Sequence, residues 1–111
     1  MILDQVIMDL QLQITTKDLA GSQALEEKIR EKAQKLSKLY DHILSCHVVV
    51  ESPERRHHKG KLYNCRILLH VPGEEIVVTH EPDVDPYVSV RDAFDAAKRQ
   101  VQDHVDRKRG R

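Results

Sequence analysis

Residues 22–50 read SQALEEKIREKAQKLSKLYDHILSCHVVV, and this stretch decides the fold. Its first part repeats apolar residues at intervals of three and four, the period of a helix with one buried face: Leu25, Ile29, Ala33, Leu36 and Tyr40. Ser22 suits the N-cap, and the early acidic residues Glu26 and Glu27 favour the positive end of the helix dipole. We therefore predict a helix from Ser22 to about Tyr40, followed by a β-rich run over residues 43–51.

Strand-like patterns flank this stretch on both sides. Before it, apolar residues at every second position predict one strand with a single buried face: Val6, Met8, Leu10, Leu12 and Ile14. After it, a polar loop over residues 52–60 leads to β-rich runs at 61–71 and 75–80, with Pro72-Gly73 as the turn between them. Together with residues 43–51, these two runs predict an antiparallel meander.

The last part of the chain predicts a second amphipathic helix, from Tyr87 to about Arg107. Its buried stripe consists of Val90, Phe94, Ala97, Val101 and Val105. The predicted order is β-α-β-β-β-α, an α+β fold in which both helices pack on one face of a four-stranded sheet, as in double-stranded-RNA-binding domains. The 111 residues suffice for one domain, which we assign to residues 1–106. We expect residues 107–111 to form a basic, disordered tail.

The charges of the chain are separated along the sequence although they sum to a formal net charge of zero. Residues 22–40 carry five basic and three acidic groups, and residues 98–111 carry six basic and two acidic groups. Residues 74–95 carry seven acidic groups against Arg91 alone. Such a distribution creates local fields that steer a polyanion onto one face and repel it from another.

Two cysteines, Cys46 and Cys65, lie in apolar strand-like runs and predict buried thiols in a reducing compartment, not a disulfide scaffold. Asp4 and Asp9 interrupt any apolar run that would form a signal peptide. No segment approaches the roughly 20 apolar residues of a membrane span. We therefore expect a soluble, cytoplasmic protein with no membrane partner.

The sequence offers little for catalysis. Seven histidines are present, and His47, Arg66 and His80 would share the sheet face opposite the helices if both hairpins are tight. Such a group can bind a metal or can form a polar, solvent-facing row, and the chain has no HExxH motif, CxxC pair or zinc-type Cys-His spacing. The four glycines are not clustered and form no phosphate loop. We predict no enzyme activity, no catalytic or metal-binding residues, no cofactor and no small-molecule substrate.

The basic residues of the two predicted helices are the candidate RNA-binding residues. They are Lys28, Lys32, Lys35 and Lys38 in the first helix, and Lys98, Arg99, Arg107 and Lys108 in the second. A solvated lysine face, or basic groups that complement the negative end of a helix dipole, would explain each stripe taken alone. Two such stripes on neighbouring helices favour phosphate contacts. Few aromatic residues are present, so recognition of structured RNA by shape and backbone fits better than base stacking.

These residues also match a known family. In the first helix and the strand after it, the matching residues are Ala24-Leu25, Lys32, Lys35-Leu36, Asp41, His42, Ile43 and Val48-Val49-Val50. In the second helix they are Asp85-Pro86-Tyr87, Val90, Asp95 and Arg99-Gln100-Val101. Over nearly its full length the chain resembles the short ribosome hibernation promoting factors, also called ribosome-associated translation inhibitors or sigma-54 modulation proteins. It departs from relatives at Arg91, where they are acidic, and at Asp103 and Val105, where they are usually basic.

The resemblance implies a stress or stationary-phase factor that binds the small ribosomal subunit in the channel used by messenger and transfer RNA. It would inhibit translation by occlusion, and residues 1–106 would be the ribosome-binding domain. The implied partner is the small subunit, through its RNA phosphates, with contacts to subunit proteins left open. Carried over by position, Lys32, Lys35, Arg99 and Arg107 would contact these phosphates. We expect a monomer when the protein is free.

Two other functions stay open from the residues. The first is a protein-interaction or regulatory domain that uses the acidic residues 74–95 and has no ribosome role. The second is a metal-dependent enzyme that uses the strand histidines. Whether a ribosome-binding protein of this kind pairs ribosomes or keeps single ones idle is not encoded in any motif of the chain. The role of the Arg- and His-rich residues 53–60 is equally open.

Overall fold

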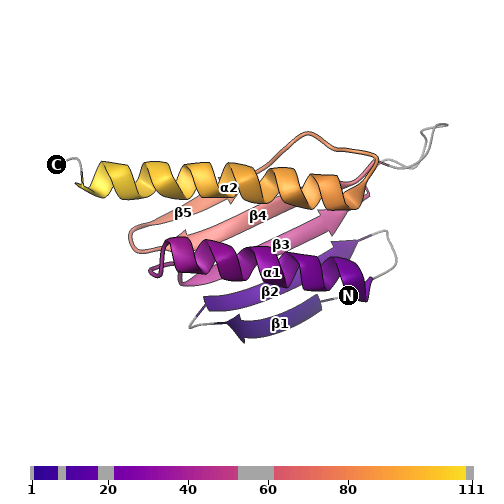
Figure 1. The fold of residues 1–111 in the computed structure, drawn as a ribbon, viewed down its shortest axis with the longest axis horizontal. Coiled ribbons are helices and arrows are strands. Elements are labelled where there is room, and N and C mark those ends of the chain that lie inside the picture. The colour runs from indigo at the N-terminus through magenta and orange to yellow at the C-terminus, as the bar shows by residue number, and fades with distance from the viewer. Residues whose placement is uncertain (1, 8–9, 18–21, 53–61, 110–111) are drawn as a thin grey trace.

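The computed structural model describes residues 2–7, 10–17, 22–52 and 62–109, and shows a five-stranded sheet with two helices across one face (Figure 1). Along the chain the elements are β1 (Ile2–Ile7), β2 (Leu10–Lys17), α1 (Gln23–Leu39), β3 (Ser45–Glu51), β4 (Asn64–Val71), β5 (Glu74–Val78) and α2 (Pro86–Arg109). The strands lie side by side in the order in which they occur in the sequence.

The sheet is mixed. β1 is antiparallel to β2, and β2 is parallel to β3, because α1 carries the chain back across the sheet between them. β3, β4 and β5 form the predicted antiparallel meander, in which Val48 pairs with Ile67 and Ile67 with Val78. The tight turn between β4 and β5 includes Gly73 at φ 88°, a left-handed conformation that favours glycine.

Capping side chains fix where the helices begin. The Ser22 hydroxyl accepts a hydrogen bond from the Leu25 amide at 3.2 Å, so the predicted N-cap of α1 is confirmed. α2 begins at Pro86, and the Asp85 carboxylate accepts from the Tyr87 amide at 2.9 Å. Neither helix in the described segments combines the length and the apolar character needed to cross a membrane.

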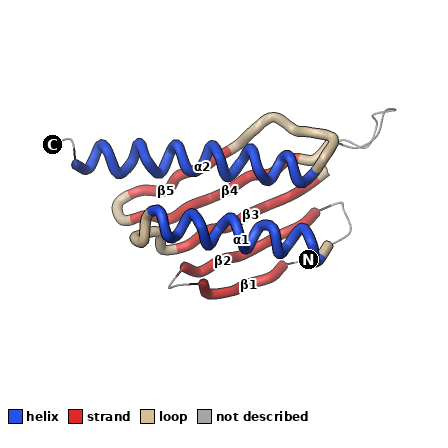
Figure 2. The backbone as a smooth tube through the Cα atoms, in the orientation of Figure 1, coloured by secondary structure: helices blue, strands red, loops and turns tan. Residues whose placement is uncertain are grey.

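The core lies between the sheet and the two helices, which Figure 2 shows side by side over the strands. The predicted stripe of each helix supplies it: Leu25, Ile29, Ala33 and Leu36 of α1 and Val90, Phe94, Ala97 and Val101 of α2 are buried. Tyr40 and Val105, the last residues of the two stripes, are partly buried against the same core. The predicted α+β fold, with both helices on one face, is confirmed.

Two details of the prediction are wrong. Residues 6–14 do not form one strand, because β1 ends at Ile7, β2 begins at Leu10, and these two residues pair across a hairpin. β1 thus adds a fifth strand to the predicted β-α-β-β-β-α order, which runs from β2 to α2. Residues 107–109 are helical and not part of a disordered tail, since α2 continues to Arg109. The Arg107 guanidinium contacts the Glu74 carboxylate at 3.3 Å, which stabilises this last turn.

The two thiols are free and buried in the core, as predicted. Cys46 pairs with Leu69 and Cys65 with Val50, so the two cysteines are offset along neighbouring strands. Burial among apolar side chains raises the pKa of each thiol from 9.0 to about 12, and the nearby Cys46 adds to the effect on Cys65. These thiols are therefore neutral parts of the core, with little nucleophilic character.

Candidate nucleic-acid interface

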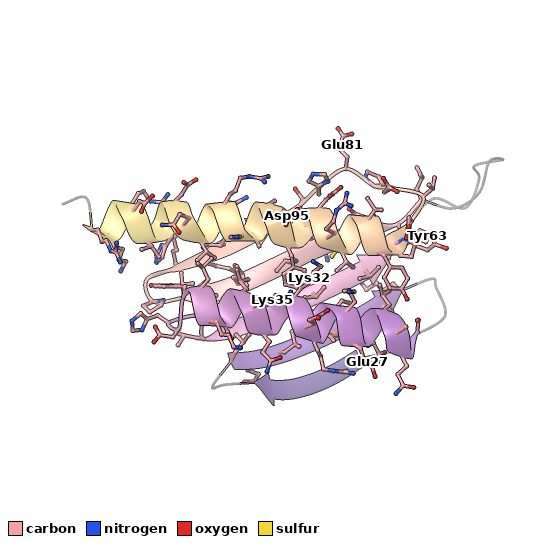
Figure 3. All side chains as sticks on the ribbon, in the orientation of Figure 1. Glu27, Lys32, Lys35, Tyr63, Glu81 and Asp95 are labelled. Atoms are coloured by element: carbon pink, nitrogen blue, oxygen red, sulfur yellow. The ribbon has the colours of Figure 1, made fainter. Side chains whose placement is uncertain are left out.

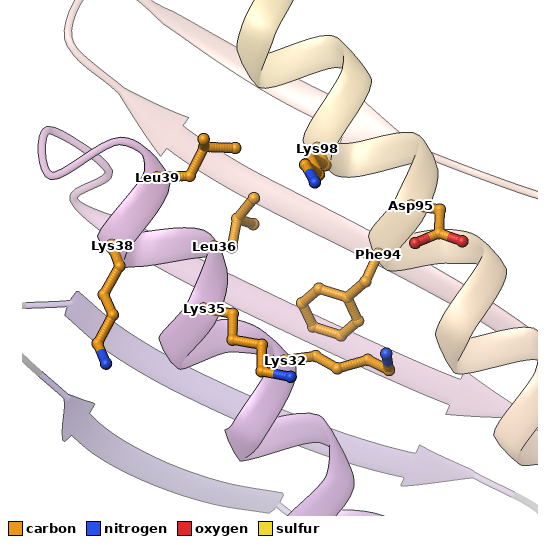
Figure 4. A pocket seen from close by; sticks show the side chains of 8 residues that line it. All are labelled: Lys32, Lys35, Leu36, Lys38, Leu39, Phe94, Asp95 and Lys98. Carbon is orange, nitrogen blue, oxygen red and sulfur yellow. The ribbon is translucent and has the colours of Figure 1, made fainter.

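A groove of about 440 Å³ runs between α1 and α2 on the outer side of the helix layer. It is lined by Lys32, Lys35, Leu36, Lys38, Leu39, Phe94, Asp95 and Lys98. Figure 4 shows Lys32 and Lys35 extending toward α2, whereas Lys38 points away from it. Four of the eight predicted RNA-binding residues therefore line one groove, three of them from α1 and one from α2.

The helical period places these lysines beside the core. Lys32 and Lys35 are direct neighbours of the buried Ala33 and Leu36, so they leave α1 at the margin of its buried stripe. Lys98 follows the buried Ala97 in the same way on α2. Lys32 and Lys35 therefore line the groove from α1, and Lys98 lines it from α2 (Figure 4).

Lys28, the first of the predicted α1 lysines, lies outside the groove. Its Nζ contacts the Glu31 carboxylate at 3.3 Å, one helical turn further along. The hydrogen bond and charge of Lys28, with smaller contributions from Lys35 and Lys32, hold the pKa of Glu31 below its ordinary value. A phosphate would have to displace this carboxylate, so Lys28 is a weaker candidate than the groove lysines.

The remaining predicted residues of α2 also lie outside the groove. Arg99 is exposed, one residue and hence about 100° of helix rotation from Lys98. Arg107 is bound to Glu74, and Lys108 borders two other hollows near the end of α2. The structure therefore separates the eight predicted residues into a groove set and a peripheral set: Lys28, Arg99, Arg107 and Lys108.

Acidic side chains are placed around the groove. Figure 3 shows Lys32 and Lys35 in the strip between the helices, Glu27 on the other flank of α1 and Glu81 beyond α2. Asp95 is the one acidic residue among the groove lining described above. The separation of charge that the sequence predicts is thus also a separation in space, with lysines in the middle of the helix face.

The strand histidines were the sequence's candidates for a metal site. Within the described residues, no group of three or more His, Cys, Asp or Glu side chains is placed to hold a metal ion. His47 Nε2 lies 2.9 Å from the Thr15 hydroxyl, and Arg66 contacts Glu51 at 3.8 Å, so these two residues belong to a polar row. The expectation that His80 shares their face is wrong. Leu68 pairs with Val77, so the odd-numbered residues of β5 lie on the face of Leu68, and β5 ends at Val78 before it reaches His80. His57 and His58 lie outside the described residues.

Sequence reasoning missed a buried histidine. His104 is 1% exposed, its Nδ1 lies 3.2 Å from the Glu74 carboxylate, and its ring packs edge-on against Tyr40 with 5.8 Å between centroids. Its position three residues after the buried Val101 follows the helical period, which is the signal that could have found it. The contact joins α1, α2 and the β4–β5 turn at one end of the molecule.

The model of the family described as Sigma 54 modulation protein / S30EA ribosomal protein matches residues 12–109 of this chain. The chain belongs to this family. The match begins within β2 and ends with α2, so it includes the β-α-β-β-β-α order and every groove residue, whereas β1 precedes it. The resemblance that the sequence predicts is therefore confirmed, and β1 lies outside the region that the family match defines.

Solved structures with the same fold include two proteins of about 20% identity. The Thermus thermophilus Protein Y N-terminal domain aligns with a TM-score of 0.66 and 21% identity, over 82% of this chain and 93% of its own. A ribosomal subunit interface protein from Coxiella burnetii aligns with a TM-score of 0.65 and 20% identity, over 84% and 94%. No curated protein sequence matches the chain. The Sigma 54 modulation protein / S30EA fold of this chain is thus shared with proteins of distant sequence.

Proposed function

We propose that this protein binds the small ribosomal subunit through the α1–α2 groove and inhibits translation by occluding the channel used by messenger and transfer RNA. The observation that carries the proposal is that Lys32, Lys35, Lys38 and Lys98 line one groove. Membership of a family described by a ribosomal protein supports the ribosome as the target. The protein acts as a bound obstacle and makes or breaks no bond.

Phosphate groups suit this groove on physical grounds. Lysine ammonium groups are compact point charges that bind phosphate oxygens, and within the described residues none of the four groove lysines forms an ion pair. They are therefore available without the loss of an existing partner. Each phosphate contact releases counterions, which makes the affinity fall as the salt concentration rises.

The experiment compares two variants of equal net charge. Lys32→Gln/Lys35→Gln removes two groove cations, and Lys17→Glu changes the net charge by the same amount on the sheet face turned away from the helices. We expect wild type and Lys17→Glu to co-sediment with purified small subunits and to inhibit translation in a reconstituted system. The double variant should lose both properties. Equal co-sedimentation of the two variants would show that the groove does not hold the RNA.

Occlusion of the channel is a separate part of the proposal. It is tested by adding the protein to small subunits whose channel is already filled. Small subunits loaded beforehand with messenger RNA and initiator transfer RNA should bind the protein much more weakly than empty subunits. Equal binding to both would place the protein outside the channel. A wild-type pull-down dominated by a protein partner, and unchanged by nuclease, would instead favour an interaction domain that uses the acidic residues 74–95.

A further inference from the structure

The floor of the α1–α2 groove is apolar, and phosphate binding makes no use of it. Leu36 and Phe94 form its buried part, at 5% exposure each, while Leu39 at the end of α1 is 44% exposed. Figure 4 shows the Phe94 ring and the Leu36 and Leu39 side chains facing the same space between the helices. An apolar floor between cationic walls suits a ligand with a flat apolar part and negative charges beside it.

We propose that the groove holds one unpaired nucleobase of RNA, with its apolar face on Leu39 and the edge of Phe94 and its flanking phosphates on the groove lysines. This inference rests on the proposed function and names the chemical unit that its groove recognises. An unpaired base can leave its stack and enter such a groove, whereas the bases of an RNA duplex cannot.

The size and shape of the groove agree with this occupant. Its volume of about 440 Å³ is within the range of about 300–1,000 Å³ that small-ligand sites have. Phe94 is too deeply buried to offer its whole ring as a stacking platform. The base would therefore rest mainly on the exposed Leu39, beside the aliphatic stems of Lys32 and Lys35.

The charges favour RNA over a peptide. Lys32 and Lys35 follow each other at about 4.5 Å along the helix axis, and Lys98 lines the groove from α2. A nucleic acid strand carries one negative charge per nucleotide, so the two phosphates that flank one base bring two negative charges to these lysines. An acidic peptide would need several closely spaced carboxylates around one apolar side chain to match the same set.

Two RNA probes of equal charge separate base contacts from phosphate contacts. One is an oligoadenylate of about 12 nucleotides, within the site sizes of single-strand binding folds, and the other is its abasic counterpart. The variants are Leu39→Ser and, as a matched control, Leu44→Ser, which alters a leucine that is 57% exposed outside the groove. Binding is measured by fluorescence anisotropy at roughly 50 mM salt, where phosphate contacts are strong.

We expect wild type and Leu44→Ser to bind oligoadenylate about tenfold more tightly than the abasic strand, a ratio within the range of one base contact. Leu39→Ser should lose most of this preference and leave abasic binding unchanged. Equal affinity of wild type for both strands, or no binding of either, overturns the base site. If wild type still co-sediments with small subunits in that case, the proposed function stands. Weakened subunit binding by Leu39→Ser, with no base preference in wild type, would assign the apolar floor to a subunit protein.

Discussion

Replacing one lysine of α1 at a time should separate groove cations from paired cations. Lys28 and Lys35 are two turns apart on the same helix, and glutamine at either position removes one charge while keeping a long polar side chain. Lys35 lines the groove, whereas Lys28 contacts Glu31 at 3.3 Å and lies outside it. The two variants thus match in charge, chemistry and helix propensity but differ in what the structure places beside them.

The expected magnitude follows from counterion release. Each phosphate contact contributes about 0.9 to the log–log dependence of affinity on salt for a duplex, and about 0.7 for a single strand. Lys35→Gln should therefore flatten the slope by about 0.7–0.9. Lys28→Gln should change it by roughly 0.2 or less, because a phosphate gains little from a lysine that must first leave a carboxylate.

The assay measures the affinity of labelled protein for purified small subunits at several salt concentrations from roughly 50 to 200 mM. Over this fourfold range, a slope change of 0.9 corresponds to about a 3.5-fold difference in how much affinity is lost. The pH stays near neutral, where Glu31, whose pKa Lys28 lowers, remains ionised. If Lys28→Gln flattens the slope as much as Lys35→Gln does, the division into groove and peripheral cations is refuted.

Two further predictions concern the core and the end of α2. The pKa of both buried thiols is about 12 in the folded protein but 9.0 when exposed, so only the unfolded state loses these protons between those values. The free energy of unfolding should therefore be unaffected by the thiols below pH 9.0 and then fall by up to about 1.4 kcal/mol per pH unit for each thiol. Urea titrations at several pH values should show a steeper alkaline loss of stability for wild type than for Cys46→Ala/Cys65→Ala. Parallel pH dependences of the two proteins would contradict the burial of the thiols. Glu74→Ala should lower the free energy of unfolding by about 1–3 kcal/mol, because it leaves His104 Nδ1 buried without a partner. Glu74→Gln can still accept a hydrogen bond from this nitrogen, so it should recover most of the lost stability in the same urea titration. Equal losses in the two variants would show that the contact is not stabilising.

Local periodicity made most of the fold predictable. The stripe from Leu25 to Leu36 and the N-cap at Ser22 both follow from residues close in the sequence, and both are confirmed. The split between β1 and β2 was missed because apolar residues continue at every second position from Val6 to Ile14, and this pattern outweighed the one turn-forming residue between the two strands, Asp9. A period-two pattern also continues on both sides of a hairpin, so it does not show where one strand ends.

The candidate site was predictable in residue type but not in grouping. Basic residues on both helices were identified from their spacing, but spacing alone does not distinguish Lys98 from Arg99. The packing of α2 against α1 determines that Lys98 lines the groove. The Glu74–Arg107 contact joins residues that are 33 positions apart, so no local sequence pattern predicts it. Leu39 was not singled out because its exposure depends on where α2 lies relative to α1.

The direction of the two helices explains why a chain of zero net charge gathers basic residues at one end of the molecule. Because β2 and β3 are parallel, α1 between them runs in the opposite direction to both strands. The two hairpins after β3 make β5 parallel to β3, so α2, which follows β5, runs in the same direction as α1. Figure 1 shows both helices running in parallel, so their C-terminal ends and their basic residues Lys38, Arg107, Lys108 and Arg109 lie at the same end of the molecule. The helix dipole alone accounts for cations at these ends, but its effect is confined to the last turn. Lys32 and Lys98 stand in mid-helix, where the dipole offers them nothing, and they line the same groove. A bound polyanion would be stabilised by these mid-helix lysines, so the proposed RNA contact is assigned to the groove and not to the basic helix ends.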